Sequence, residues 1–259
     1  MIHNTAVIDK SAVIEDNVEI GPYSVIGEGV VIKSGTVIGS NTYIEYAEIG
    51  QNCKIFNSVS IGTPPQDFSY KNEPSKAYIC DGTTLREFVT VNRGTAKTGK
   101  TIVGKNCYFM ISAHVAHDCI VGDNVIIGNC SMLGGHVQVG DNAFISGLAG
   151  VHQFTRVGKG TMTAGGTIVT MDTIPFTMCY GGSTGDRPVI NGLNLVGMKR
   201  RGMTSKEIEE VKAVYKILFM SKLLLKDALT ELEKNPSPNV KEIVDFIKTS
   251  KRGIARPGN

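Results

Sequence analysis

Four of the five histidines of this chain lie close together in the sequence, where they could move protons or bind a metal. They are His114, His117, His136 and His152, and they fall within 39 residues. A neutral imidazole accepts a proton near neutral pH, and a set of three imidazoles can also bind zinc. Two interpretations therefore stay open at this point, a general base in a cleft and a three-histidine metal site.

Two neighbours of these histidines suit acyl transfer. Asp118 follows His117 directly, and at a turn its carboxylate can orient the imidazole as a base. A glycine pair ending at Gly135 precedes His136, and glycines let backbone N–H groups approach an oxyanion. An ordinary glycine turn is the plain alternative for that pair.

The elements that must position these residues repeat every six residues. Aliphatic side chains recur at that spacing, the next residue is often Gly, and the residue two before is often small. Helices and plain strands have shorter periods, whereas a six-residue period predicts a parallel β-helix with 18-residue coils. Large aromatic rings do not fit inside so narrow a prism, which explains 30 Gly, 7% aromatic residues and no Trp. The repeat is carried by Ile8, Ile14, Ile20, Ile26, Ile32, Ile38 and Ile44 and, later, by Val103, Phe109, Val115, Val121, Ile127, Leu133, Val139, Ile145, Val151 and Val157.

The cysteines fit this repeat as packing residues. Cys53, Cys107 and Cys119 occupy the small inward positions, and none of the six cysteines forms a C-x-x-C pair. We expect reduced thiols and a cytoplasmic location, with no export signal. No apolar run approaches the length of a membrane span, so no integral membrane segment is expected either.

The repeat is interrupted by segments with loop composition. We expect inserted loops at 63–78 and 94–101, and the repeat decays before the Gly/Ser/Thr/Asp-rich segment Gly181–Pro188. We therefore assign 1–190 to a β-helix domain and 191–259 to a small helical domain. Inserted loops on solenoids usually serve binding.

Helical spacing marks the C-terminal part. Thr204 and Glu207 fit a capping box, and apolar residues then keep helical spacing to about Asn235. Ser237-Pro238 fits the start of another helix.

Charge divides along the same boundary. The chain has a net charge of +3, which splits into −3 for residues 1–190 and +6 for residues 191–259. The basic run Lys199-Arg200-Arg201 stands before the expected helices and suits phosphate recognition. The tail therefore favours an acidic partner or a phosphate-bearing substrate, with a solvated helix surface as the alternative.

Four sequence blocks carry a resemblance that covers essentially the whole chain. They closely resemble the UDP-N-acetylglucosamine O-acyltransferases of lipid A biosynthesis, a step toward lipopolysaccharide. The blocks are S-A-H-V-A-H-D-C at 112–119, G-G-H-V at 134–137, V-H-Q-F at 151–154 and K-R-R-G at 199–202. Gln66-Asp67, Arg93-Gly94-Thr95 and Lys251-Arg252-Gly253 match as well.

The resemblance implies a left-handed parallel β-helix that assembles as a homotrimer with active sites between subunits. It implies transfer of a 3-hydroxyacyl group from acyl carrier protein to the 3-position of a UDP-linked glucosamine. No metal and no nucleic acid is implied. No separate cofactor is implied either, because the acyl donor itself carries 4'-phosphopantetheine. The implied roles are His117 as general base, Asp118 as its partner and Gly135 as oxyanion donor. The implied substrate contacts are Gln66, Asp67, His114, His136, His152, Gln153, Gly165, Asn194, Arg200 and Arg201.

Three departures from the family pattern touch the substrate contacts, one of them a segment around Gly181–Pro188 that is a few residues longer. Ser69 stands where the family often has Lys, and Val196 where it often has Glu, so the acceptor is either the plain N-acetyl sugar or its 3-amino analogue. Gly165 lies where some relatives have a bulky residue, which favours a longer acyl chain. Other classes remain as alternatives: the UDP-sugar N-acyltransferase of the same pathway, a carbonic-anhydrase-like zinc lyase, and a non-catalytic prism that only binds acyl carrier protein.

Overall fold

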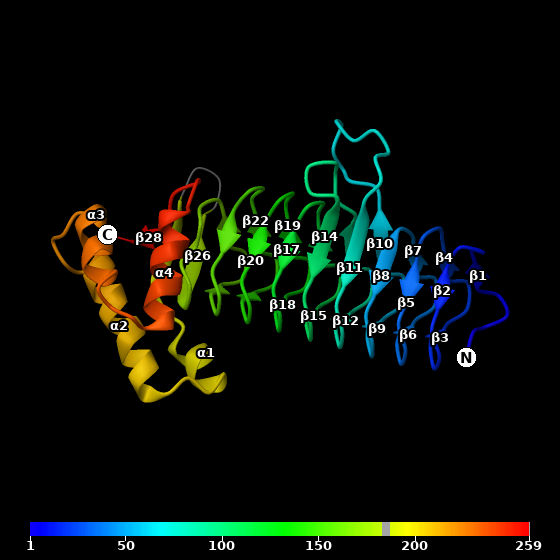
Figure 1. Ribbon diagram of the computed structural model, residues 1–259, viewed down its shortest axis with the longest axis horizontal. Coiled ribbons are helices and arrows are strands. Elements are labelled where there is room, and N and C mark those ends of the chain that lie inside the picture. Colours follow the sequence, from blue (N-terminus) through cyan, green and yellow to red (C-terminus); the bar gives the residue numbers. More distant parts are fainter. Residues whose placement is uncertain (183–186, 259) are drawn as a thin grey trace.

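The computed structural model describes residues 1–182 and 187–258, which form a long prism with a helical end (Figure 1). The central part of the segment Gly181–Pro188 thus lies outside the described residues. Short parallel strands wind around the prism, and each pairs with the equivalent strand of the next coil, as Val7 pairs with Val25. The predicted coil, with three short strands in each turn of the prism, is confirmed.

Three sheets form the faces of the prism. The first sheet contains β1 (Val7–Ile8), β4 (Val25–Ile26), β7 (Tyr43–Ile44), β10 (Ser60–Thr63), β13 (Thr90–Asn92), β16 (His114–Val115), β19 (Met132–Leu133), β22 (Gly150–Val151) and β25 (Ile168–Val169). The second contains β2 (Val13–Ile14), β5 (Val31–Ile32), β8 (Ala47–Ile49), β11 (Lys76–Ile79), β14 (Lys100–Val103), β17 (Ile120–Val121), β20 (Gln138–Val139) and β23 (Arg156–Val157). The third contains β3 (Glu19–Ile20), β6 (Val37–Ile38), β9 (Lys54–Ile55), β12 (Thr84–Leu85), β15 (Tyr108–Phe109), β18 (Ile126–Ile127), β21 (Phe144–Ile145), β24 (Met162–Thr163), β26 (Thr177–Gly181), β27 (Pro188–Leu193) and β28 (Arg256–Pro257).

The core follows from the repeat. The second residue of nearly every strand is a buried aliphatic, such as Ile26, Ile127 and Leu133, and these residues form one continuous cluster. Cys53, Cys107 and Cys119 are buried beside them, as predicted for packing residues. Burial raises the pKa of the Cys107 thiol to about 12, so it stays protonated.

Three edges of turns join the faces, and two of them need names. We call the turns from the first sheet to the second the imidazole edge, and the turns from the second sheet to the third the aspartate edge. Both inserted loops replace turns of the imidazole edge, between β10 and β11 and between β13 and β14, where they protrude side by side (Figure 1). The loops span 64–75 and 93–99 rather than the expected 63–78 and 94–101. The first loop is shorter because β10 extends to Thr63 and β11 begins at Lys76, and the second lies between the end of β13 at Asn92 and the start of β14 at Lys100.

The helical end has its own core and joins the prism through the third sheet. The helices are α1 (Leu195–Arg200), α2 (Ser205–Phe219), α3 (Leu225–Leu232) and α4 (Pro238–Lys248). β26 and β27 form an antiparallel hairpin, and β28 returns to pair with β27 after the last helix. The expected boundary at 190/191 therefore falls inside β27. Among the described helices, none is long and apolar enough to cross a membrane.

The sequence predicted correctly where α2 and α4 begin, but it did not predict where α2 ends. The capping box of Thr204 and Glu207 opens α2, and Pro238 stands at the start of α4 with Ser237 before it. The expectation of one helix to about Asn235 is wrong, because α2 ends at Phe219. There the Ser221 hydroxyl donates to the Ile217 carbonyl and accepts from the Leu223 N–H, which competes with the helical backbone bonds.

Candidate functional site

The imidazole edge stacks equivalent turn residues from successive coils. His117, Gly135 and Gln153 occupy one turn position in three successive coils, and Asp118, His136 and Phe154 occupy the next. The backbone at Asp118, His136 and Phe154 is left-handed, with φ of 60°, 60° and 62°. This shared turn conformation arranges the side-chain positions in two columns along one edge.

His117 and Asp118 form a hydrogen-bonded pair. The His117 Nδ1 lies 2.7 Å from Asp118 Oδ2, and both side chains are nearly buried. An ionised carboxylate can only accept, so Nδ1 carries the hydrogen and Nε2 of the neutral ring is left with a free lone pair. That arrangement makes Nε2 the atom that can take a proton from a substrate.

The loop 93–99 fixes the carboxylate of this pair. Asp118 accepts from the Thr95 N–H at 3.0 Å, from the Thr95 hydroxyl at 2.8 Å and from the Thr98 hydroxyl. Burial by itself would raise the pKa of Asp118, but the hydrogen bonds from Thr98, His117 and Thr95 outweigh it and hold the pKa below the ordinary value. Asp118 is therefore a fixed anion behind the imidazole.

Gly135 leaves room for the His117 ring. A Cβ at this position would lie 2.6 Å from Cε1 and 2.7 Å from Nε2 of His117. Among the described residues, the Gly135 N–H has no hydrogen-bond acceptor. A free backbone donor thus lies beside the atom that can act as base, which is the arrangement that stabilisation of an oxyanion requires.

His136 belongs to the same cluster, with a neighbour that the sequence analysis did not assign to the site. Its ring lies 5.3 Å from the His117 ring and stacks on Phe154, with centroids 4.5 Å apart and planes 7° apart. Burial lowers the pKa of His136 and outweighs the nearby Asp118 charge, which would raise it. The sequence clue to Phe154 was the V-H-Q-F block at 151–154, which ends on an aromatic residue in a chain poor in aromatics.

The other two clustered histidines have different surroundings. His114 lies on the first sheet, where its Nδ1 is 2.7 Å from the Thr90 hydroxyl, and burial lowers its pKa. His152 is exposed, and its Nδ1 contacts the carbonyl of the next residue, Gln153. The structure thus joins His117 and His136 through ring contact, while His114 and His152 flank them.

The loop 64–75 brings Gln66 and Asp67 to this edge. Asp67 accepts from the Ser69 N–H and hydroxyl, each at 2.8 Å, and these bonds lower its pKa, with smaller contributions from the charges of His117 and Lys97. Gln66 is exposed. Asp67 therefore lies within electrostatic reach of His117.

A buried arginine anchors that loop to the prism. Arg93 donates to the Tyr70 hydroxyl at 2.9 Å, to the Gly62 carbonyl at 2.7 Å and to Glu45 at 3.0 Å. Its guanidinium also lies over the Tyr46 and Tyr70 rings. Arg93 is 7% exposed, so this clamp holds the loop that carries Gln66 and Asp67.

The remaining predicted contacts lie on other edges of this chain. Asn194 is buried, caps α1 by accepting from the Gly197 N–H, and donates to the Gly160 carbonyl at 2.9 Å. Arg201 donates to the carbonyls of Gly160 and Asn142, both on the aspartate edge, and Arg200 is exposed at the end of α1. The basic run was expected before the helices, but Lys199 and Arg200 form the last turn of α1, a helix that was not predicted. The run and the imidazole pair are not brought together within one chain.

Gly165 lies on the third edge, in the turn after β24. The nearest atom to a Cβ there would be the Gly147 carbonyl oxygen at 3.5 Å, so a larger side chain could be accommodated.

A metal site of three histidines is not gathered in the described part of the chain. The cluster that combines donor atoms within 4.8 Å of one another is His117, Asp118 and His136. Asp118 already accepts from His117, Thr95 and Thr98, so its oxygens are committed to hydrogen bonds. This donor set suits a carboxylate-supported base better than an ion.

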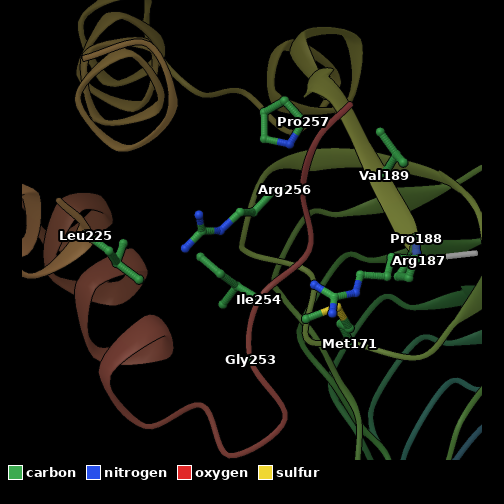
Figure 2. A pocket seen from close by; sticks show the side chains of 9 residues that line it. All are labelled: Met171, Arg187, Pro188, Val189, Leu225, Gly253, Ile254, Arg256 and Pro257. Carbon is green, nitrogen blue, oxygen red and sulfur yellow. The ribbon is translucent and has the colours of Figure 1, made fainter. Parts of the chain in front are cut away.

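A separate cavity of about 590 Å³ lies at the helical end, and none of the predicted site residues lines it (Figure 2). Leu225 of α3 faces β28 across it, and Arg187 and Arg256 contribute guanidinium groups.

Family comparisons agree with the fold and with the expected class. Residues 172–255 match the UDP N-acetylglucosamine O-acyltransferase domain 2 family, and 1–34, 11–46 and 100–135 match the bacterial transferase hexapeptide family. The acyl-[acyl-carrier-protein]–UDP-N-acetylglucosamine O-acyltransferase of Campylobacter concisus is 43% identical over 80% of this chain and 78% of its own length. The enzyme of that name from Thermodesulfovibrio yellowstonii is 45% identical over 81% of both chains.

Solved structures give the same result. The UDP-N-acetylglucosamine acyltransferase of Francisella novicida superimposes with a TM-score of 0.96 at 39% identity, covering 100% of this chain and 95% of its own. The enzyme of that name from Bacteroides fragilis gives 0.94 at 40% identity, covering 99% and 100%. The prism is the left-handed parallel β-helix that the resemblance implied.

Proposed function

Because the chain belongs to the family of UDP-N-acetylglucosamine O-acyltransferases, we propose that it moves a 3-hydroxyacyl group from acyl carrier protein to the 3-hydroxyl of UDP-N-acetylglucosamine. This is the first step of lipid A biosynthesis. The observation that carries the chemistry is the free Nε2 of His117, with Asp118 hydrogen-bonded behind the ring and the Gly135 N–H beside it.

The reaction follows from these three groups. His117 Nε2 takes the proton of the sugar hydroxyl as the oxygen attacks the thioester carbonyl. The Gly135 N–H donates to the oxyanion that forms, and Asp118 stabilises the imidazolium. The C–S bond then breaks, and Nε2 returns its proton to the departing phosphopantetheine thiolate. The proton taken from the sugar hydroxyl is thus the one given to the thiolate, and the step needs no cofactor.

A product assay tests this function. Purified protein is given UDP-N-acetylglucosamine or its 3-amino analogue with acyl carrier proteins loaded with 3-hydroxyacyl chains of increasing length, and products are identified by mass spectrometry. We expect an ester on the plain sugar and a preference for a longer chain, because Gly165 leaves space. An amide on the 3-amino analogue alone would change the acceptor, and no product from either sugar would contradict the function.

We further propose that the active enzyme is a homotrimer with sites between subunits. Arg201 and Asn194 contact the aspartate edge, away from His117, and Arg200 precedes Arg201 at the end of α1, so a site that uses both groups needs two chains. Mixed assemblies of His117→Ala and Arg200→Ala subunits should then recover activity that neither variant has alone. Light scattering should give about three times the chain mass of 27.8 kDa.

The donor partner fits the charge of the helical end. Acyl carrier protein is acidic, and residues 191–259 have a net charge of +6 against −3 for the rest of the chain. Complementary charge of this kind raises association rates and makes them sensitive to salt.

A further inference from the structure

A lysine that no sequence motif singled out stands at the imidazole edge. Lys97 lies in the loop 93–99, is exposed, and places its Nζ 5.9 Å from the centroid of the Phe154 ring. Phe154 in turn stacks on His136, whose ring touches that of His117. The ammonium group is thus two aromatic layers away from the imidazole that we propose as the base.

The backbone of Lys97 is anchored by the residues that hold the proposed catalytic carboxylate. Its N–H donates to the Thr95 hydroxyl at 3.3 Å, and Thr95 and Thr98 on either side both donate to Asp118. The loop therefore fixes where the lysine stem begins, while the ammonium group stays in solvent. Among the described residues, Lys97 has no carboxylate within 4.0 Å, so its charge is available to a ligand.

The charges around His117 explain why a cation is needed there. Asp67 and Asp118 both bring negative charge close to His117, and the pKa of each is held below its ordinary value by hydrogen bonds. Both proposed substrates carry phosphate, as a diphosphate in the UDP-sugar and as the phosphodiester of phosphopantetheine. Such a group would be repelled by the two carboxylates alone. The basic run at 199–201 lies along the aspartate edge and does not serve this edge of the same chain.

We propose that Lys97 binds a phosphate group of a substrate while that substrate's reacting atoms lie at His117. This inference rests on the proposed acyl transfer and adds a binding residue to it. A flexible ammonium with several donors suits a phosphate that approaches from solvent, and the Phe154 ring lies beneath the ammonium group.

Steady-state kinetics with both substrates varied separately tests the proposal. Lys97→Met removes the charge and keeps the stem, and Lys97→Arg keeps the charge. Lys10→Met is the matched control, because Lys10 is an exposed lysine on the same edge in the first coil, seven coils before the turn that carries Phe154. We expect Lys97→Met to raise one substrate's KM about 10- to 100-fold, as for loss of a hydrogen bond to a charged group. Lys97→Arg should restore it in large part, and Lys10→Met should match the wild type.

The pattern of KM identifies the phosphate. A rise in the KM of the UDP-sugar alone assigns the contact to the diphosphate, and a rise in that of the acyl carrier alone assigns it to phosphopantetheine. The affected KM of the wild type should also increase with ionic strength more steeply than that of Lys97→Met. Unchanged KM values for both substrates, or a fall in kcat alone, would overturn the proposal. A wild-type protein without acyl transfer would instead contradict the proposed function, so the two failures are distinguishable.

Discussion

The imidazole edge and the aspartate edge are built from the same turn and use it in opposite ways. In this four-residue turn, the third residue has a left-handed backbone. The second and third residues are Asp123 and Asn124 in a turn of the aspartate edge, and His117 and Asp118 in a turn of the imidazole edge. On the aspartate edge, Asp123 Oδ1 accepts the Lys105 N–H at 2.7 Å, and the Asp123 N–H donates to Asp141 at 2.9 Å. Each aspartate thus ties its coil to the coil before it.

On the imidazole edge, Gly135 does not take part in such a series of bonds from a backbone N–H to an aspartate of the next coil. The residue one coil beyond Gly135 is Gln153, and the Gly135 N–H has no acceptor among the described residues. The carboxylate of Asp118 is used on the His117 ring and on the loop 93–99 instead. The same turn therefore stabilises the prism on one edge and exposes a base and a donor on the other. Substitutions on the two edges should separate activity from stability.

The largest separation is expected at His117. His117→Ala removes the proposed base and should lower the turnover of acyl transfer by about 100- to 10,000-fold. The melting temperature and the oligomer mass should stay close to those of the wild type, because the ring lies outside the prism core. The matched control is Asp123→Ala at the equivalent turn position, which should keep its turnover. Near-wild-type turnover in His117→Ala would show that the base has been wrongly assigned.

A smaller but still large effect is expected at Gly135. In Gly135→Ala the new Cβ would lie 2.6 Å from His117 Cε1, so the ring must move from its place beside Asp118. We expect about 100-fold lower kcat, the size of effect seen when one oxyanion donor or its geometry is lost. Gly147→Ala is the control, since its Cβ would come no closer than 3.4 Å to any neighbour. Equal kinetics in the two variants would contradict the account of Gly135.

Thr98 is expected to act through Asp118 and to have a moderate effect. Thr98→Val removes one donor from the carboxylate, so the pKa of Asp118 should rise and the imidazole should be held less firmly. We predict about a tenfold lower kcat with little change in either KM, on the scale of one hydrogen bond to a charged group. Thr98→Ser should recover most of the loss. A change confined to KM would show that Thr98 serves substrate binding instead.

The edges also show how far sequence reasoning reaches. The six-residue period predicted the coil, the core and the small inward cysteines, because each depends on a local rule repeated many times. Which side chains meet depends on the register between coils, so His136 stacks on Phe154, its equivalent in the next coil, rather than on His152. The contact of His117 with Asp118 was foreseen as a turn effect. The hydrogen bonds that Thr95 and Thr98 donate to Asp118 were not foreseen, because an irregular loop outside the six-residue repeat carries these residues to the carboxylate.

The helical end was harder to foresee for a different reason. At the break between α2 and α3, the Ser221 side chain competes for backbone bonds within an otherwise continuous helical pattern. The return of β28 to the third sheet pairs residues that are far apart in the sequence, as Val189 with Arg256. Neither the period nor the helix-start rules contain such long-range pairing.

On the aspartate edge, stability should change while chemistry does not. Asp123→Ala removes the acceptor of the Lys105 N–H and should lower the free energy of unfolding by about 0.5–1.5 kcal/mol. In a chain of this size, each kcal/mol of lost stability lowers the Tm by roughly 2–4 °C. Calorimetry together with the transfer assay measures both quantities. A loss of turnover larger than the loss of folded protein would mean that this edge takes part in the reaction.

The smallest expected difference between the edges is their response to mild acid. Burial lowers the pKa of His114 and His136, so the folded protein resists protons that the unfolded chain binds near pH 6.5. Their contribution to stability is therefore present above about pH 6.5 and is lost as the pH falls below that value. On the aspartate edge, the Gln51 N–H and Lys105 lower the pKa of Asp81, so its contribution lasts until the pH falls below about 4. Urea midpoints between pH 7.5 and 5 should fall in the wild type and fall less in His136→Asn and His114→Asn, while His3→Asn in the exposed first coil should follow the wild type. Parallel curves for all four proteins would show that the acid response does not come from the imidazole edge.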